Sequence, residues 1–393
     1  MKKAFIFAAA AALVLAACSK NEIIETINKV PEEVAIGFSN YTPNAVTKAN
    51  DTYTGTTLLK NGGKFAVMSY STANGTAWAS DAIGTNFMDK VAVTWTTNDT
   101  PANNSYSPTR YWPSGDSPAW LTFWAYYPVN EASGGVADNT AAGNNGIVYT
   151  SPTGSNGIGS FNFTVANTAA DMVDFMVTDL AKDYVYGTAV GTNPNVAVDG
   201  VVPLTFHHAL TKVQFVFQTD NADANTTITI NSATLKNIVK KGTLTVQETF
   251  ATATNATTPW TPSTEATDKG DYTVTINTKT EDVALTNATA GTPVTPIPMT
   301  VDNEDIFLMV PQEVTTGKNL VIVWTVATGG VSTQNTSTID LSTIDIKATD
   351  ESKNLWKANK SVVYTITVGL KPIKFTGTVT AWDTDTNAAI SVN

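Results

Sequence analysis

Residues that carry catalytic and cross-linking chemistry are scarce in this sequence. Its 393 residues include one cysteine, Cys18, two adjacent histidines, His207 and His208, and a single arginine, Arg110. One cysteine excludes an intramolecular disulfide, so stability must rest on the burial of apolar side chains. Neighbouring residues of a strand point to opposite faces, so the two histidines cannot easily share a metal ion or one nucleophile. Since no GxSxG-type nucleophile elbow is present either, we expect no enzyme, no metal site and no cofactor.

Charged residues are also few, and their signs are unbalanced. They make up 15% of the chain, and 23 lysine and arginine residues stand against 34 aspartate and glutamate residues, a net charge of −11. Loss of Lys2 and Lys3 with an N-terminal signal leaves 21 minus 34, or −13. An acidic chain has little electrostatic attraction for nucleic acid, so we expect no nucleic-acid partner.

The N-terminus has the layout of an export signal. Lys2 and Lys3 precede an apolar run from Ala4 to Ala17, which is too short to span a bilayer. The run Leu15-Ala16-Ala17-Cys18 resembles the lipobox of bacterial lipoproteins, which implies cleavage before Cys18 and acylation of that residue. We predict a signal peptide over residues 1–17, a lipid on Cys18 and a polar tether over 18–33. The alternative is an ordinary secretory signal with an incidental cysteine.

The rest of the chain predicts strands almost throughout. Thr and Val abound, and apolar residues alternate with polar ones in segments such as 212–219 and 362–370. That period of two is typical of half-buried antiparallel strands, whereas helical periods are scarce. A fresh strand begins after residue 205, and roughly 360 mature residues suit two domains better than one. We predict an all-β protein of two tandem antiparallel β-sandwich domains, residues 34–205 and 206–393.

An aromatic cluster admits two interpretations. It comprises Trp112, Trp120, Trp124, Tyr126 and Tyr127. Exposed rings of this kind form sugar-stacking platforms, whereas buried ones pack between strands. Both faces of segment 120–127 are apolar, with Trp124 on one and Phe123 on the other, which favours a central strand buried on two sides. We therefore predict that Trp124 lies in the core.

Acidic residues offer only weak site signals. The run 302–305 ("DNED") and the pair Asp383 and Asp385 have oxygen ligands for calcium but lack the twelve-residue loop that binds it. Solvated acidic turns are the favoured interpretation. Asp171, Asp174 and Asp179 would suit glycoside hydrolysis only at a defined carboxylate separation, which the sequence does not supply.

Several segments together resemble the fimbrillin family, the lipoprotein precursors of type V pili. Their order and spacing carry the resemblance from Ile36-Gly37-Phe38 almost to the end of the chain. The matching segments are Ile36–Phe38, Thr47–Ala49, Tyr111–Pro113, Leu121–Pro128, Asp174–Met176, Leu204–Val213, Tyr364–Val368 and Val379–Trp382.

This resemblance implies two transthyretin-like domains and export as a lipoprotein to the outer membrane. It also implies that a protease removes an N-terminal strand and that a strand from another subunit fills the vacated groove, so that copies or related fimbrillins join into a filament. Family members often carry arginine at the processing point. Here the only arginine is Arg110, and Lys48 stands at the matching position, so processing must use another specificity or not occur.

The two ends of the chain hold the candidate strands for such an exchange. Val34, Ile36 and Phe38 alternate with small residues, and cleavage after Lys48 would remove them. The expected donor is the C-terminal segment, in which Phe375, Val379 and Ala381 share one face and Trp382 points to the other.

We expect a pilus structural subunit, as a stalk, anchor or accessory component, that supports adhesion through a host or bacterial surface ligand. The chain ends eleven residues past Trp382, so we expect no further adhesive domain, which suits a stalk better than a large tip. The alternative from another class is a monomeric surface glycan-binding lipoprotein.

Overall fold

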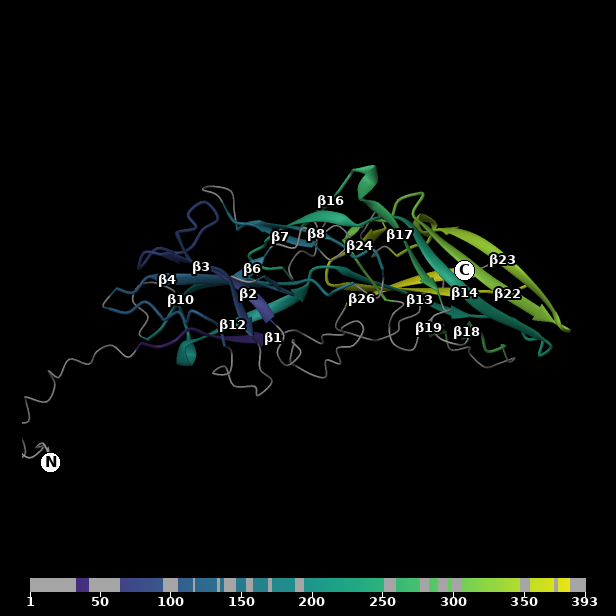
Figure 1. Cartoon of the computed structure of the whole chain (residues 1–393), viewed down its shortest axis with the longest axis horizontal. Helices are drawn as coiled ribbons and strands as arrows, with labels where there is room; N and C mark the ends of the chain where they lie inside the picture. Colours follow the sequence, from purple (N-terminus) through teal and green to yellow (C-terminus); the bar gives the residue numbers. More distant parts are fainter. Residues whose placement is uncertain are drawn as a thin grey trace, which may run out of the picture.

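The computed structural model is built almost entirely of strands. They run along the long axis of an elongated molecule (Figure 1). The structure describes residues 33–41, 64–94, 105–115, 117–132, 135–137, 146–152, 158–168, 172–187, 194–250, 259–275, 283–288, 296–298, 306–346, 354–370 and 374–381. Within these ranges the helical elements are short 3₁₀ turns, and no helix there is long and apolar enough to cross a membrane. The prediction of an all-β fold is confirmed.

The first half of the chain forms a large curled sheet. Its strands are β1 (Gly37–Tyr41), β2 (Lys64–Thr72), β3 (Thr85–Thr94), β4 (Trp120–Tyr127), β9 (Met176–Thr178), β10 (Ala181–Val185), β11 (Asn195–Val196) and β12 (Val201–His208). The order is β1-β12-β9-β4-β10-β11, with β2 and β3 extending from β4. The sheet curls so far that its edge strand β1 packs on β2 and β4, where Phe38 meets Phe65 and Phe123.

β4 is buried on both faces, as its sequence predicts. On one face Trp124 stacks on Tyr70 with 5.4 Å between ring centroids. On the other face Phe123 packs edge-on against Phe38 at 5.8 Å. Trp112, Trp120, Trp124 and Tyr126 are buried and Tyr127 is half-buried, so the packing interpretation of the aromatic cluster is confirmed.

A four-stranded sheet covers the Trp124 face of β4. It consists of β7 (Gly146–Thr150), β8 (Ser160–Thr164), β15 (Lys241–Thr245) and β16 (Trp260–Pro262) in the order β16-β15-β8-β7. β8 and β15 pair from Ser160↔Thr245 to Thr164↔Lys241. Strands from both sides of residue 205 therefore share one sheet, and the division into domains at that residue stays a prediction. β5 (Asn130–Ala132) and β6 (Gly135–Ala137) form a separate two-stranded hairpin.

Two further sheets form a sandwich in the second half. One has β13 (Thr211–Gln218), β19 (Ile297–Pro298), β20 (Phe307–Met309), β25 (Lys360–Thr367) and β26 (Lys374–Ala381). The other has β14 (Thr226–Val239), β17 (Lys269–Thr275), β18 (Val283–Ala284), β22 (Asn319–Thr328) and β23 (Val331–Asp340). Tyr272 and Phe307 meet between the two sheets at 6.5 Å. β21 (Gln312–Glu313) and β24 (Leu355–Trp356) form a short separate pair.

Strand direction differs in places from the antiparallel prediction. β13 and β25 pair in parallel from Thr211↔Lys360 to Gln218↔Thr367, although their outer neighbours β20 and β26 are antiparallel to them. β1 also pairs in parallel with β12. Alternation of apolar and polar residues indicates which side chains of a strand are buried. Parallel and antiparallel strands show the same alternation, so the sequence pattern does not distinguish the two directions of pairing.

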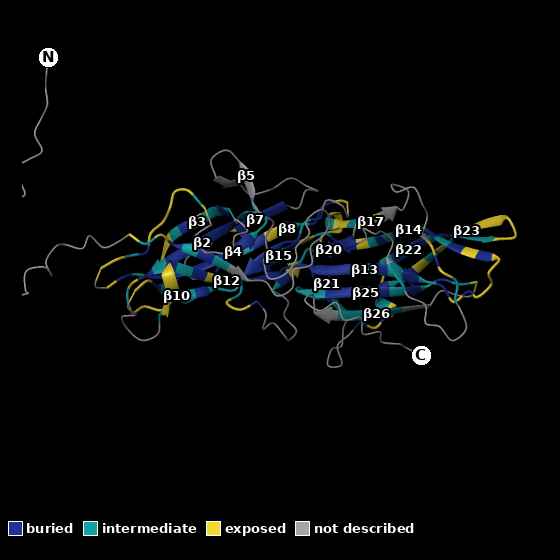
Figure 2. Ribbon diagram, turned by 90° about the horizontal axis from the view of Figure 1, so that it is seen from below, coloured by how far each residue is buried: buried dark blue, intermediate teal, exposed yellow. Residues whose placement is uncertain are grey.

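One apolar core is continuous through both halves, as the buried strands in Figure 2 illustrate. Phe161 of β8 contacts Phe175, and Phe175 contacts Trp260 of β16 at 6.3 Å. Trp260 donates its indole N–H to the Ala209 carbonyl at 2.6 Å, just before β13 begins. A second core lies between β1, β2, β4 and β12.

Candidate strand-exchange site

β1 forms one edge of the curled sheet and fills the core beneath it. Ile36 is 1% exposed and Phe38 is fully buried, while Val34 packs half-buried against the same cluster. Phe38 alone meets three aromatic rings, those of Phe65, Tyr106 and Phe123. Since the three apolar residues alternate, they turn to one face, as the sequence predicts.

The backbone of this segment changes partner at Ile36. Ile36 donates its N–H to the Arg110 carbonyl at 2.9 Å, and Trp112 donates its N–H to the Val34 carbonyl at 3.0 Å. From Gly37 onward the chain pairs instead in parallel with the first five residues of β12. Residues 110–112 therefore hydrogen-bond to Val34 and Ile36, and β12 pairs with residues 37–41.

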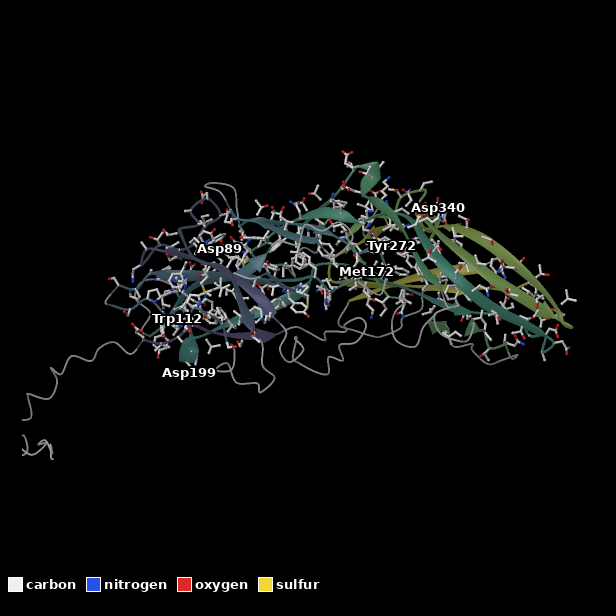
Figure 3. All side chains as sticks on the ribbon, viewed as in Figure 1. Asp89, Trp112, Met172, Asp199, Tyr272 and Asp340 are labelled. Atoms are coloured by element: carbon white, nitrogen blue, oxygen red, sulfur yellow. The ribbon has the colours of Figure 1, made fainter. Side chains whose placement is uncertain are left out.

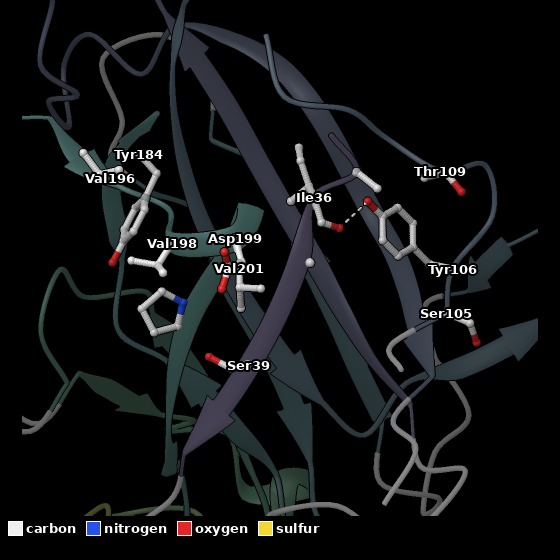
Figure 4. A pocket seen from close by; sticks show the side chains of 13 residues that line it. Ile36, Ser39, Ser105, Tyr106, Thr109, Tyr184, Val196, Val198, Asp199 and Val201 are labelled. Atoms are coloured by element: carbon white, nitrogen blue, oxygen red, sulfur yellow. Dashed lines mark hydrogen bonds between the residues drawn. The ribbon is translucent and has the colours of Figure 1, made fainter. Parts of the chain in front are cut away.

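Tyr106 adds a side-chain contact to this segment. Its hydroxyl donates to the Ile36 carbonyl at 2.8 Å (Figure 4) and accepts the Arg110 N–H at 3.3 Å. Burial raises the pKa of Tyr106 above its ordinary value of 10.0, so the phenol keeps its proton and remains a donor at neutral pH. Sequence analysis missed Tyr106, because it lies in an irregular stretch without periodicity.

A turn before β12 brings the chain against the start of β1. Gly200 has φ +76°, and a Cβ there would lie 2.7 Å from Cγ1 of Val34 and 3.0 Å from the Ala35 carbonyl oxygen. Trp112 donates its indole N–H to the Gly200 carbonyl at 2.9 Å. Trp112 and Asp199 accordingly lie at the same end of the molecule in Figure 3. Only glycine combines this positive φ with such a close approach.

A cavity of about 970 Å³ opens on the outer side of β1. Ala35, Gly37 and Ser39 of the β1 segment line it, and Tyr106 and Tyr184 stand on opposite walls (Figure 4). Burial also raises the pKa of Tyr184. Ala35, Gly37 and Ser39 are small, and the cavity therefore has room for larger side chains at these three positions.

The predicted donor residues lie in a second edge strand. Phe375, Val379 and Ala381 all fall within β26, which pairs antiparallel with β25 over eight positions. Val379 is half-buried and packs against the main core. Cys18, Lys48 and Trp382 lie outside the described residues, so their predicted roles stay predictions.

Comparison with known proteins identifies the family. A sequence profile described as fimbrillin-like matches residues 47–382. The chain belongs to the fimbrillin-like family. The resemblance found in the sequence is confirmed. No curated protein matches this fimbrillin-like chain in a sequence comparison.

Solved structures resemble this fimbrillin-like chain over most of its length. A fimbrial protein from Bacteroides vulgatus ATCC 8482 aligns with TM-score 0.53 and 18% identity over 88% of this chain and 99% of its own. The tip fimbrial protein Mfa3 from Porphyromonas gingivalis aligns with TM-score 0.32 and 10% identity over 82% of this chain and 95% of its own. The first of these similarities supports a shared fold.

The two histidines of this fimbrillin-like chain face different carboxylates. His207 Nε2 lies 3.0 Å from Asp179 Oδ2, and its ring stacks on Phe250. His208 Nδ1 lies 2.7 Å from Asp174 Oδ2, with both side chains almost fully buried. The prediction that adjacent histidines point apart is confirmed. Asp174 and Asp179 thus each bind a histidine.

The remaining acidic candidates lie elsewhere. Asp171, residues 302–305, Asp383 and Asp385 fall outside the described residues. Among the residues that are described, no three His, Cys, Asp or Glu side chains gather as a metal site would require.

Proposed function

We propose that this fimbrillin-like chain is a structural subunit of a type V pilus, acting as a stalk, anchor or accessory component that supports adhesion at the cell surface. Its role would be structural rather than catalytic. Assembly would follow proteolytic removal of β1 and entry of a strand from another copy or a related fimbrillin. The observation that supports the proposal is the position of β1, an edge strand whose segment buries the side chains of Ile36 and Phe38.

Removal of β1 would create a strong binding groove. The pockets of Ile36 and Phe38 would open, and the outer backbone groups of β12 would lose their partners over five residue pairs. Refilling such a groove would be favoured by a free energy of about 1.5–3 kcal/mol for each large apolar side chain that is buried again. An incoming extended strand satisfies both the apolar surface and the open edge, which is β-augmentation.

The proposed processing step would follow Lys48. Lys48 follows Tyr41, the last residue of β1, so cleavage after it would detach the whole strand together with the N-terminal tether. A lipid on Cys18 would hold the precursor at the outer membrane until that cut, and release of the lipidated segment would couple anchoring to assembly.

The proposed donor is the C-terminal segment. Its inner face would present Phe375, Val379 and Ala381 to the groove, in place of the apolar face of β1. Its outer face would include Trp382, and the cavity beside Ala35, Gly37 and Ser39 would offer space for a large side chain. If each copy donated its strand to the next one, head to tail and without closing a ring, this contact would build a filament.

Expression of residues 49–393 tests the proposal. We expect ladders of oligomers that resist mild detergent, because each exchanged strand would dissociate slowly. The same protein without residues 374–393 is the matched control and should remain monomeric. Monomers from the first protein, or unchanged ladders from the second, would falsify strand exchange for this chain.

A further inference from the structure

β23 is a long, regular edge strand at one end of the molecule. It closes the order β17-β14-β22-β23 and pairs with β22 from Thr328↔Val331 to Asn319↔Asp340 without a shift of register. The turn between them is Gly329-Gly330, with φ +57° and +82°, which is typical of a tight two-residue hairpin. In such a ladder alternate residues turn their backbone N–H and C=O groups to the free side.

The free side of β23 is accessible to another strand. Residues 331–334 are exposed, and Val331 keeps 69% of its surface in water. Figure 2 shows the strand at the end of the molecule, with exposed residues along it. In the part of the chain that the structure describes, no strand pairs with its outer side.

Two other edge strands of this chain carry charges within their length, whereas the charged residue of β23 is its last, Asp340. β3 has Asp89, Lys90 and shifts of register, and β17 has Lys269 and Asp271. Charges and irregularities of this kind block pairing between molecules. Residues 331–339 of β23, by contrast, contain no charged residue and no proline.

The nearest two strands of the sheet are also free of charge over most of their length. Residues 319–328 of β22 and 226–235 of β14 contain no Asp, Glu, Lys or Arg, although the whole chain has a net charge of −11. Two copies of an acidic protein repel each other over most of their surface. Residues 331–339 of two copies would bring no like charges together, so a second copy is the occupant that this edge fits.

We propose that β23 is a self-association edge, at which two copies pair their β23 strands antiparallel about a two-fold axis. The result is one continuous sheet across both subunits. Identical strands related by a two-fold axis pair antiparallel. The residue at the axis then faces the same residue of the other copy. This contact needs neither removal of β1 nor the C-terminal strand, and it would join subunits or filaments side by side.

Cysteine cross-linking in the full-length chain tests this pairing. Each residue from 332 to 338 is replaced in turn by cysteine in a Cys18→Ser background, so that the introduced thiol is the only one. Thr273→Cys, exposed on β17 at the opposite edge of the sheet, is the matched control. At the central position we expect disulfide-linked dimers to form about tenfold faster or more than in the control.

A charge placed on the edge should abolish the contact. Thr336→Lys brings two like charges together across the axis, whereas Thr227→Lys adds the same charge to β14, away from the edge. Sedimentation should show monomers for the first variant and dimers for the second, with equal melting temperatures. Cross-linking no faster than the control at all seven positions would overturn the proposal. So would dimers in Thr336→Lys, or binding of a 374–393 peptide to this edge in place of a second copy.

Discussion

Trp124 lies in β4, the strand that is buried on both faces. It is 1% exposed and stacks on Tyr70 with an angle of 4° between the ring planes. Truncation to alanine would leave a large cavity in the continuous core, so Trp124→Ala should lower the free energy of unfolding by about 3–5 kcal/mol. Denaturant titration measures this loss.

The control for this prediction is Tyr111→Ala, because Tyr111 is 44% exposed. Its stability should change by no more than about 0.5 kcal/mol. An unchanged melting temperature for Trp124→Ala together with lost sugar binding would contradict the core assignment and favour a glycan-binding protein.

Single residues differ in how far the sequence reveals their roles. The burial of Trp124 and Phe38 is predictable, since each belongs to an alternating run in which one face must be covered. The contacts of Tyr106 and Gly200 are not predictable, because both depend on where separate segments of chain meet. The pairing of His207 with Asp179 likewise needs the fold, although the opposite orientation of the two histidines does not.

At the scale of elements, β1 is held in place by the segment of residues 105–112. Tyr106→Phe removes the hydroxyl that donates to the Ile36 carbonyl and leaves the ring packed on Phe38. Loss of one such hydrogen bond costs about 0.5–1.5 kcal/mol, so the amides of residues 37–41 should exchange with solvent roughly two- to tenfold faster. Hydrogen exchange of the intact precursor measures this effect.

Tyr184→Phe is the matched control, since Tyr184 stands on the opposite wall of the same cavity. It should leave exchange in β1 unchanged. Equal exchange in wild type and Tyr106→Phe would show that the hydroxyl does not hold the strand.

The identity of the strands was easier to predict than their pairing. Residues 212–219 and 362–370 alternate clearly, and both form strands, yet they lie side by side in parallel. The pairing of β8 with β15 across residue 205 has no signal in the sequence either. Partner and direction depend on how distant segments pack, and local periodicity contains neither.

For the molecule as a whole, we predict that attachment to a membrane depends on a lipid on Cys18. Cys18→Ser removes the only thiol that a lipid could occupy, so it should abolish acyl labelling and release the protein from membranes. Radiolabelled fatty acid and membrane fractionation measure the two effects. Continued labelling and membrane association of the variant would contradict the lipobox interpretation.

The alignment of strands with the long axis has a mechanical consequence. β14 pairs with β22 over ten positions, and β22 pairs with β23 over ten more. Backbone hydrogen bonds lie across the strands, and Figure 1 shows β14, β22 and β23 running obliquely along the molecule, so tension along its length loads these ladders partly in shear. A force perpendicular to the strands would instead break these hydrogen bonds one after another. Because forced unfolding follows the rate of unfolding, this orientation makes the chain more resistant to extension along its long axis than across it.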